Sequence, residues 1–361
     1  MGFVRNDEIH RQELEDFRRM LLASAGAYKV NAHEHRGEEG TRAGKAKIGT
    51  AQDDEEEKLV CVTSGVSFLG LALVNKLLSR GYSVRVIVDS EGDVEKVEEM
   101  RRNNSNIWPV TAKLSEVESL EAAMEGCRGV FHTSGFVDPA GLTGYSKAMA
   151  GIEVKASENV MEACARTPSV KGCVLTSSLL ACVWQGGFNA DPSPIVDHDS
   201  WSDEAFCLDR KLWYAWGKLK AEKAAWRVAE EKGLRLSTIC PALVTGPEFY
   251  RRNPTATIAY LKGAYEMYGS GLLATVDVTR LAEAHVVVFE AMSKASFGRY
   301  ICFDSVVGGE AEAENLAAET GMPLNRITGD GSSSFSTRFE LSDGRLSGLM
   351  SRTSCYSESQ E

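Results

Sequence analysis

The most distinctive chemistry in this sequence belongs to Tyr214 and Lys218, in the segment YAWGK. Residues four apart on a helix lie one above the other, so a helix over 213–231 places the phenol and the ammonium on one face. A free phenol has a pKa of about 10 and transfers protons poorly at neutral pH, whereas a neighbouring ammonium is expected to lower that pKa. The pair predicts an acid–base site centred on Tyr214. The alternative is a surface Tyr and Lys that pack along a helix. The elements around the pair distinguish the two interpretations.

A nucleotide-type unit precedes this pair, in the stretch KLVCVTSGVSFLGLALVNKLLSRGYSVRVIVD over 58–89. A buried strand over 59–63, a turn over 64–70, an amphipathic helix ending near Gly81 and a second strand over 82–88 are predicted. Asp89 closes the unit. Strand, glycine turn, helix, strand and acid is the order typical of a dinucleotide-binding unit. The expected cofactor contacts here are Thr63, Gly65, Ser67, Phe68, Leu69, Gly70 and Asp89.

Strands and helices continue to alternate along the chain, with the fifth predicted strand running into Thr176-Ser177-Ser178 and the sixth ending at Pro241. This order predicts an α/β fold with a doubly wound parallel sheet (Rossmann) and a smaller C-terminal substrate lobe. The expected division is an N-terminal extension with an amphipathic helix and a mobile linker (1–57), a dinucleotide-binding domain (58–240), a substrate lobe (241–347) and a disordered tail (348–361).

The composition indicates which partners the protein can bind and in which compartment it is expected. The formal charge of −11 argues against nucleic acid as a partner. Nine cysteines without regular spacing or a Cys-x-x-Cys pair predict neither a disulfide framework nor a metal site, and favour the cytoplasm. No apolar run approaches a membrane span. The helix expected over 7–25 would dock on the body of the protein or on a protein partner.

Several segments together resemble the extended short-chain dehydrogenase/reductase superfamily, which has an NAD-dependent epimerase/dehydratase-type fold. The similarity is to its plant cinnamoyl-CoA reductase and dihydroflavonol reductase group, including a cinnamoyl-CoA reductase-like branch. The matching segments are VFHTS, ENVMEAC, VLTSS, SWSDEAFC, LWYAWGKLKAEKAAW, CPALVTGP and GRYIC, within 58–347.

The resemblance implies a role for several residues. Tyr214 is the general acid that protonates a carbonyl oxygen, Lys218 lowers its pKa and binds the nicotinamide ribose, and Ser178 hydrogen-bonds the same oxygen. From the residues alone, Ser177 is an equal candidate for that last role. The resemblance further implies that Pro241 and Val244 line the nicotinamide and that Thr133 lies near the cofactor.

The chain also departs from that group. Ser64 and Ser67 replace the first two glycines of the phosphate turn, which predicts weaker cofactor binding. Asp89 stands where NADPH-dependent relatives carry Arg, which favours NAD over NADP, although Arg85 on the same strand is a possible offset. Of the residues associated with CoA recognition, Lys262 is retained. Trp184, Phe188 and Trp216 are candidate walls of an aromatic pocket or core residues.

The predicted function is therefore an NAD(P)H-dependent oxidoreductase that reduces a small phenylpropanoid-like carbonyl or thioester, with Tyr214 as general acid. The alternative is a weak or inactive dinucleotide-binding pseudo-enzyme that acts through partners. His132 and His285, each in apolar surroundings, are expected to be core groups rather than ligands.

Overall fold

The computed structural model describes residues 58–133, 145–185, 194–292, 296–329 and 339–358. The expected N-terminal helix and linker lie outside the described residues. The body of the chain is a seven-stranded parallel sheet in the order β10-β7-β5-β4-β1-β2-β3. Its strands are β1 (Leu59–Val62), β2 (Ser83–Val88), β3 (Ile107–Thr111), β4 (Gly129–His132), β5 (Gly172–Thr176), β7 (Leu236–Pro241) and β10 (Arg299–Cys302).

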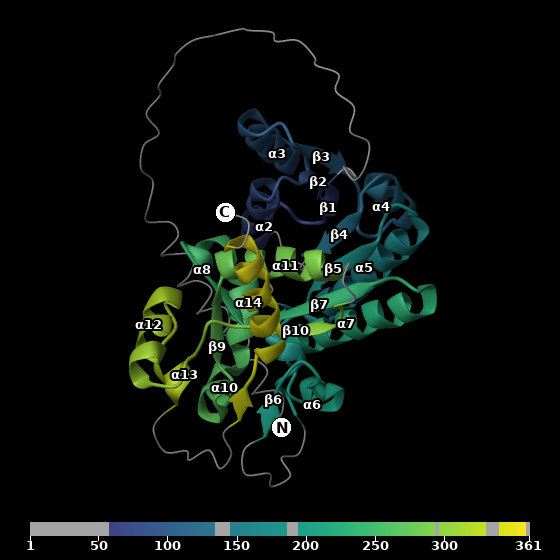
Figure 1. Ribbon diagram of the computed structural model, residues 1–361. Helices are drawn as coiled ribbons and strands as arrows, with labels where there is room; N and C mark the ends of the chain where they lie inside the picture. Colours follow the sequence, from purple (N-terminus) through teal and green to yellow (C-terminus); the bar gives the residue numbers. More distant parts are fainter. Residues whose placement is uncertain (1–57, 134–144, 186–193, 293–295, 330–338, 359–361) are drawn as a thin grey trace, which may run out of the picture.

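Helices cover both faces of this sheet (Figure 1). Along β1, Val60 and Val62 pack on one side, with α2 (Phe68–Ser79), α3 (Glu91–Asn103) and α11 (Val278–Met292). Leu59 and Cys61 pack on the other side, with α4 (Val117–Met124), α5 (Lys147–Arg166) and α7 (Trp213–Lys232). Successive side chains of a strand point to opposite faces, so each apolar strand supplies two cores. The doubly wound α/β fold is confirmed.

A smaller set of elements follows β7. The strands β8 (Leu243–Thr245), β9 (Ala274–Asp277) and β11 (Ser305–Val306) form a separate three-stranded sheet. Around them lie α8 (Phe249–Arg252), α9 (Pro254–Tyr260), α10 (Ala264–Ser270), α12 (Glu310–Thr320) and α13 (Asn325–Thr328). By contrast, two elements within 241–347 belong to the large sheet: β10 is one of its strands and α11 packs on one of its faces.

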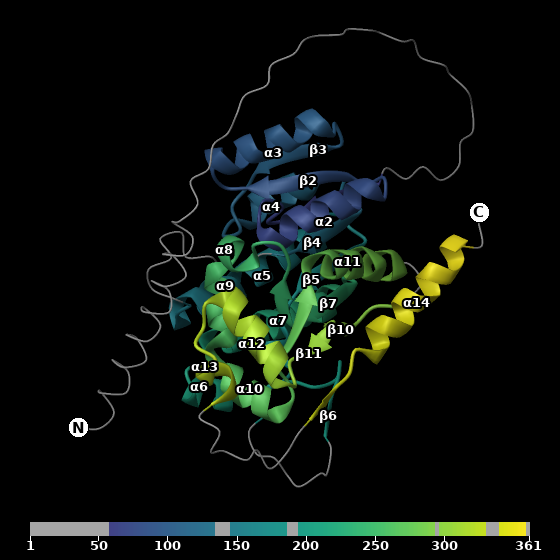
Figure 2. The ribbon, with the colours of Figure 1, turned by 90° about the vertical axis from the view of Figure 1, so that its left-hand side faces the viewer.

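Two local expectations need correction. Residues 348–361 were expected to be disordered, but α14 (Gly344–Glu358) continues through most of this range and packs on α11 and β10, as Figure 2 shows. The pattern of residues 255–268 also predicts a single helix, whereas the structure breaks this segment with a 3-10 turn, η2 (Leu261–Gly263). A side chain at Gly263 would overlap the Trp184 indole, so the break lets the backbone approach that ring.

The remaining short elements flank these layers. They are the 3-10 turn η1 (Leu179–Ala181), α6 (Glu204–Asp209), and β6 (Ile195–Val196), which pairs with β12 (Glu340–Leu341). At the far edge of the large sheet, β3 pairs with β2 and carries Pro109 opposite Val86. Among the described helices, none has the length and apolar character needed to cross a membrane.

Candidate active site

Helix α7 presents Tyr214 and Lys218 on one face, as the spacing predicts. The ammonium of Lys218 lies 5.7 Å from the centre of the Tyr214 ring. Lys218 is 4% exposed and Tyr214 is half-buried, so neither is a surface residue. One turn further along, Glu222 is fully buried and its carboxylate accepts hydrogen bonds from Ser177, Thr238 and Arg299. The packing-along-a-surface alternative is therefore wrong for this pair.

The ammonium of Lys218 is paired with a carboxylate that the sequence analysis did not identify. Lys218 Nζ lies 2.6 Å from Oε1 of Glu153, and both side chains are at most 5% exposed. The hydroxyl of Tyr145 donates a hydrogen bond to Oε2 of the same carboxylate. Glu153 comes from α5, which packs along α7. The half-buried Tyr214 phenol, the buried Lys218 ammonium and the buried Glu153 carboxylate therefore lie next to one another in this order.

This carboxylate changes the acidity of the phenol. Burial raises the pKa of Tyr214; the Lys218 ammonium opposes that rise and the Glu153 carboxylate adds to it, so the net direction is upward. Burial lowers the pKa of Lys218, but Glu153, Tyr214 and Glu222 together outweigh burial, so the pKa of the ammonium is raised. The expectation that Tyr214 has a lowered pKa is wrong, because burial of the phenol, with a further contribution from Glu153, outweighs the effect of the ammonium.

The two serines after β5 have different surroundings. The Ser177 hydroxyl donates to Glu222 Oε2 at 2.7 Å, inside the buried network. The Ser178 hydroxyl accepts from the amide of Leu180 at 3.2 Å and so caps η1, which packs against α7. Ser177 is therefore committed to the core, and Ser178 keeps a proton that it can donate to a ligand oxygen.

The turn after β1 is closed by a side chain. Ser67 is the N-cap of α2: its hydroxyl accepts from the amide of Gly70 at 3.0 Å and donates to the carbonyl of Ser64 at 2.8 Å. A Cβ at Gly70 would overlap the Ser64 carbonyl, so glycine is required there for the close approach of helix and turn. Gly65 lies against Val86, where a Cβ would be 2.6 Å from the nearest methyl carbon, and is a packing glycine.

The other predicted cofactor residues follow the carboxyl ends of neighbouring strands. Thr63 and Thr133 come directly after β1 and β4, the strands between which the winding reverses, and ligands of such sheets bind at that edge. Thr133 is 7% exposed, and its hydroxyl has no hydrogen-bond partner within the described ranges. A buried orphaned hydroxyl at the switch point fits a dinucleotide group. Pro241 ends β7 at the same edge, and Val244 lies half-buried in β8.

Asp89 lies exposed just after β2. The Arg85 Nη1 donates to the carbonyl of Ala123 at 3.2 Å, beside the end of α4. An offset of the Asp89 charge by Arg85 stays a prediction.

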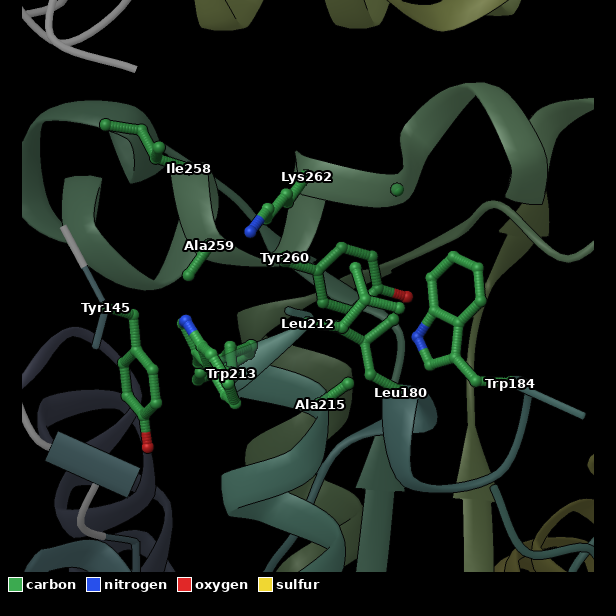
Figure 3. Close-up of a pocket in the computed structure, with 12 residues that line it drawn as sticks. Tyr145, Leu180, Trp184, Leu212, Trp213, Ala215, Ile258, Ala259, Tyr260 and Lys262 are labelled. Carbon is green, nitrogen blue, oxygen red and sulfur yellow. The ribbon is translucent and has the colours of Figure 1, made fainter. Parts of the chain in front are cut away.

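A pocket opens beside Tyr214 (Figure 3). Its apolar wall comes from α7, η1, α9 and η2, with Lys262 on one side; the lining residues are Tyr145, Leu180, Trp184, Leu212, Trp213, Tyr214, Ala215, Ile258, Ala259, Tyr260, Lys262 and Gly263. The cavity volume is about 60 Å³, below the roughly 300–1,000 Å³ of most small-molecule sites. A flat ring enters only if one of the half-buried walls, such as Trp213 or Leu212, moves.

Of the three aromatic residues predicted as pocket walls, the structure places one in the pocket. Trp184 lines the pocket, whereas Trp216 is absent from its lining and donates to Glu204 at 3.3 Å; Phe188 lies outside the described residues. Lys262 donates to the backbone carbonyl of Lys211 at 2.6 Å. The sequence analysis missed Tyr145, Glu153, Trp213 and Tyr260. For Glu153 a signal existed: it is the acid on the otherwise small and apolar stripe Ala150, Glu153, Ser157 and Val160 of α5.

His132 and His285 are buried core groups. His132 bonds Thr63 Oγ1 at 3.0 Å and Ser157 Oγ at 3.2 Å, and His285 bonds Thr176 Oγ1 and the carbonyl of Leu281, each at 2.7 Å. Burial, with a smaller effect of Lys218, lowers the pKa of His132 to about 3, and burial lowers that of His285 to about 4. Both are neutral at physiological pH.

The chain is similar to several known proteins. The sequence profile of the 3-beta hydroxysteroid dehydrogenase/isomerase family matches residues 61–302. The chain is 36% identical over 256 residues to cinnamoyl-CoA reductase 1 of Petunia hybrida (69% of this chain, 74% of the relative). It is 37% identical over 256 residues to cinnamoyl-CoA reductase 1 of Arabidopsis thaliana (69% and 71%).

Among solved structures, yeast methylglyoxal/isovaleraldehyde reductase Gre2 complexed with NADPH superimposes with a TM-score of 0.59 at 19% identity, covering 81% of this chain and 93% of that one. At this identity the superposition supports the fold, and the sequence matches carry the family. The resemblance described from the sequence is confirmed: the chain belongs to the 3-beta hydroxysteroid dehydrogenase/isomerase family and is an NAD(P)-dependent oxidoreductase of the short-chain reductase type.

Proposed function

We propose that this protein reduces the carbonyl or thioester carbon of a small aromatic, phenylpropanoid-like molecule, with Tyr214 as the proton donor. The observation that carries the proposal is the position of Tyr214: its phenol lines an aromatic pocket, and the buried Lys218–Glu153 pair lies beside it. The bound dinucleotide supplies the hydride, and the residues of the chain hold the substrate and supply the proton.

The predicted catalytic residues and several of the predicted cofactor residues have roles in this proposal. Tyr214 donates its hydroxyl proton to the substrate oxygen as negative charge develops there. Ser178 donates a second hydrogen bond to the same oxygen. Lys218, kept charged by Glu153, binds the nicotinamide ribose, while Pro241 and Val244 flank the nicotinamide ring. The amides of Phe68 and Leu69, at the start of α2, hold the pyrophosphate together with the end of the turn.

The pocket defines the shape of the proposed substrate. Trp184, Trp213 and Tyr260 line the pocket, and aromatic side chains of this kind suit an aromatic ring. Lys262 is the cation of the lining, and in this structure its ammonium already bonds the Lys211 carbonyl. An anionic tail such as a CoA phosphate would have to displace that bond. We therefore infer that the ring, rather than a phosphate-bearing tail, provides most of the binding energy.

We further propose that NAD is preferred to NADP, because Asp89 can accept hydrogen bonds from a free ribose 2′-hydroxyl and repels a 2′-phosphate. Cytoplasmic localisation and docking of the N-terminal helix on a protein partner remain proposals from the sequence.

The test is a reduction assay. Purified protein is mixed with NADH or NADPH and a panel of aromatic aldehydes, ketones and hydroxycinnamoyl thioesters, and the loss of nicotinamide absorbance is followed. Turnover is expected, with a fall of about 100-fold or more in Tyr214→Phe, since general-acid catalysis contributes that much. Dinucleotide binding without turnover on any compound would instead support the pseudo-enzyme alternative, which the Ser67-capped phosphate turn favours.

A further inference from the structure

Glu153 occupies an unusual position for an acidic residue. Its side chain is 4% exposed, and it lies between two helices rather than at the protein surface. Both carboxylate oxygens are engaged, Oε1 by the Lys218 ammonium and Oε2 by the Tyr145 hydroxyl. A buried carboxylate is costly to maintain unless it is paired in this way. We therefore ask how its charge affects the two groups beside it.

The effect follows from electrostatics. A phenol beside a bare buried ammonium loses its proton more readily, because the phenolate would gain an ion-pair partner. Here the ammonium is already paired with Glu153, so a phenolate would add a second negative charge to a neutral pair. An ammonium without Glu153 would, for its part, lose its proton more readily because of burial. Glu153 therefore opposes loss of either proton.

We propose that Glu153 is a positioning residue that keeps Tyr214 and Lys218 both protonated well above neutral pH, so that the site remains a proton donor over a wide alkaline range. This inference rests on the proposed role of Tyr214 as general acid. Glu153 itself does not contact substrate; it acts through Lys218 and through the charge it brings to the site.

The other titratable groups around Tyr214 do not supply this charge. On α7 these are Lys218 and, behind it, Glu222, which is paired with Arg299 by a contact of 2.8 Å. From β4, His132 is neutral. Burial raises the pKa of both Tyr145, before α5, and Tyr260, on α9, so both phenols keep their protons. Among the described residues facing Tyr214, Glu153 is therefore the anion whose removal changes the local charge balance.

The decisive variant is Glu153→Gln, which keeps the shape and removes the charge. With carbon-labelled tyrosine and lysine, the resonances of Tyr214 and Lys218 are assigned from Tyr214→Phe and Lys218→Met and titrated by NMR. The first proton of the pair is expected to leave at a pH lower by about one unit or more in Glu153→Gln. In the reduction assay, the alkaline limb of kcat/KM is expected to move down by the same amount.

Two further variants make the result specific. Glu158→Gln is the matched control, because Glu158 lies on the same helix and pairs with Arg227 at 2.7 Å on an exposed face; its titration is expected to match wild type. Glu153→Asp retains the charge and is expected to restore the alkaline limb. Should Glu153→Gln not fold, Glu153→Ala makes the same prediction. A merely structural role would lower activity at every pH without moving the limb.

An unchanged titration of the Tyr214–Lys218 pair in Glu153→Gln overturns the inference. The NMR titration needs no substrate, so it decides the role of Glu153 even if no panel compound is reduced. Conversely, if wild type is inactive or Tyr214→Phe keeps full turnover, the proposed function fails while the titration still gives its own answer.

Discussion

The Ser67 hydroxyl forms hydrogen bonds with two backbone groups at the start of α2, where the pyrophosphate is proposed to bind. It accepts from the Gly70 amide and donates to the Ser64 carbonyl. Amides at the start of a helix are the groups that bind a phosphate, and here one of them is already satisfied from within the chain. The side chain thus stabilises the helix start, and we expect it to do so at the expense of anion binding.

Ser67→Gly is expected to tighten dinucleotide binding about fivefold, since the freed amide gains roughly 1 kcal/mol from one hydrogen bond to phosphate. Calorimetric titration with NADH and NADPH measures the change. Asp203→Gly is the control, because Asp203 caps α6 in the same way, accepting from the Phe206 amide at 3.0 Å, and is not among the predicted cofactor residues. Equal affinity in wild type and Ser67→Gly would show that the cap does not compete with the cofactor.

Asp89 gives a second prediction at this scale. Wild type is expected to bind NADH more tightly than NADPH by about tenfold, because a surface carboxylate repels a nearby 2′-phosphate by roughly 1–4 kcal/mol. Asp89→Asn keeps the shape and is expected to shrink the ratio, and Asp89→Arg to reverse it. The Kd values of the two cofactors, measured at one ionic strength, decide; a wild-type preference for NADPH contradicts the prediction.

Helix α7 is held between two buried ion pairs. Lys218 pairs with Glu153 of α5 on one side, and Glu222 pairs with Arg299 of β10 on the other. The Arg299 guanidinium also lies 3.5 Å from the centre of the Trp201 ring. Tyr214, Lys218 and Glu222 share a helix face at four-residue intervals, so fixing two of them orients the third. The helix as a whole therefore sets the direction of the Tyr214 phenol.

The break at η2 is the element that shapes the pocket. In Gly263→Ala the new methyl group would overlap the Trp184 indole, so the ring must move into the cavity or η2 must shift. The expected result is a loss of about 1–3 kcal/mol in unfolding free energy, as for an overpacked core, with a raised KM for aromatic substrates. Gly151→Ala in α5, where a Cβ meets nothing within 4 Å, is the control and is expected to be neutral or slightly stabilising. An unchanged KM in Gly263→Ala would place substrate elsewhere.

The sequence predicted those features that depend on order along the chain. Alternating strands and helices predict the parallel sheet, and four-residue spacing predicts that Tyr214 and Lys218 share a face. It did not predict contacts between elements distant in sequence. The packing of α5 on α7, which brings Glu153 to Lys218, is an example, because it depends on tertiary structure. The error in the pKa of Tyr214 has a similar origin, because neither the burial of the phenol nor the approach of Glu153 follows from spacing along one helix. It also explains why Ser177 and Ser178 were indistinguishable until Glu222 was placed beside one of them.

At the scale of the whole molecule, stability should depend on pH through two buried imidazoles. His132 and His285 have pKa values of about 3 and about 4 in the folded state, against about 6.5 when unfolded. Between these values the unfolded chain binds more protons, so unfolding free energy is full above pH 6.5 and falls as the pH drops toward the folded pKa values. Each histidine contributes a slope of about 1.4 kcal/mol per pH unit.

Urea unfolding followed by circular dichroism at a series of pH values between 7.5 and 4.5 measures this slope. His132→Asn is expected to remove about half of it. A free energy of unfolding that is flat across this range would mean that the two imidazoles are hydrated in the native state.

Pro109 in the outermost strand has a consequence for how copies of this protein can meet. It has no amide hydrogen, and it lies within β3, whose outer side has no partner strand among the described residues. A strand from another molecule would find its ladder interrupted there. Growth of the sheet from one subunit into the next is therefore disfavoured at this margin, and a homodimer, should one form, is not expected to join through β3.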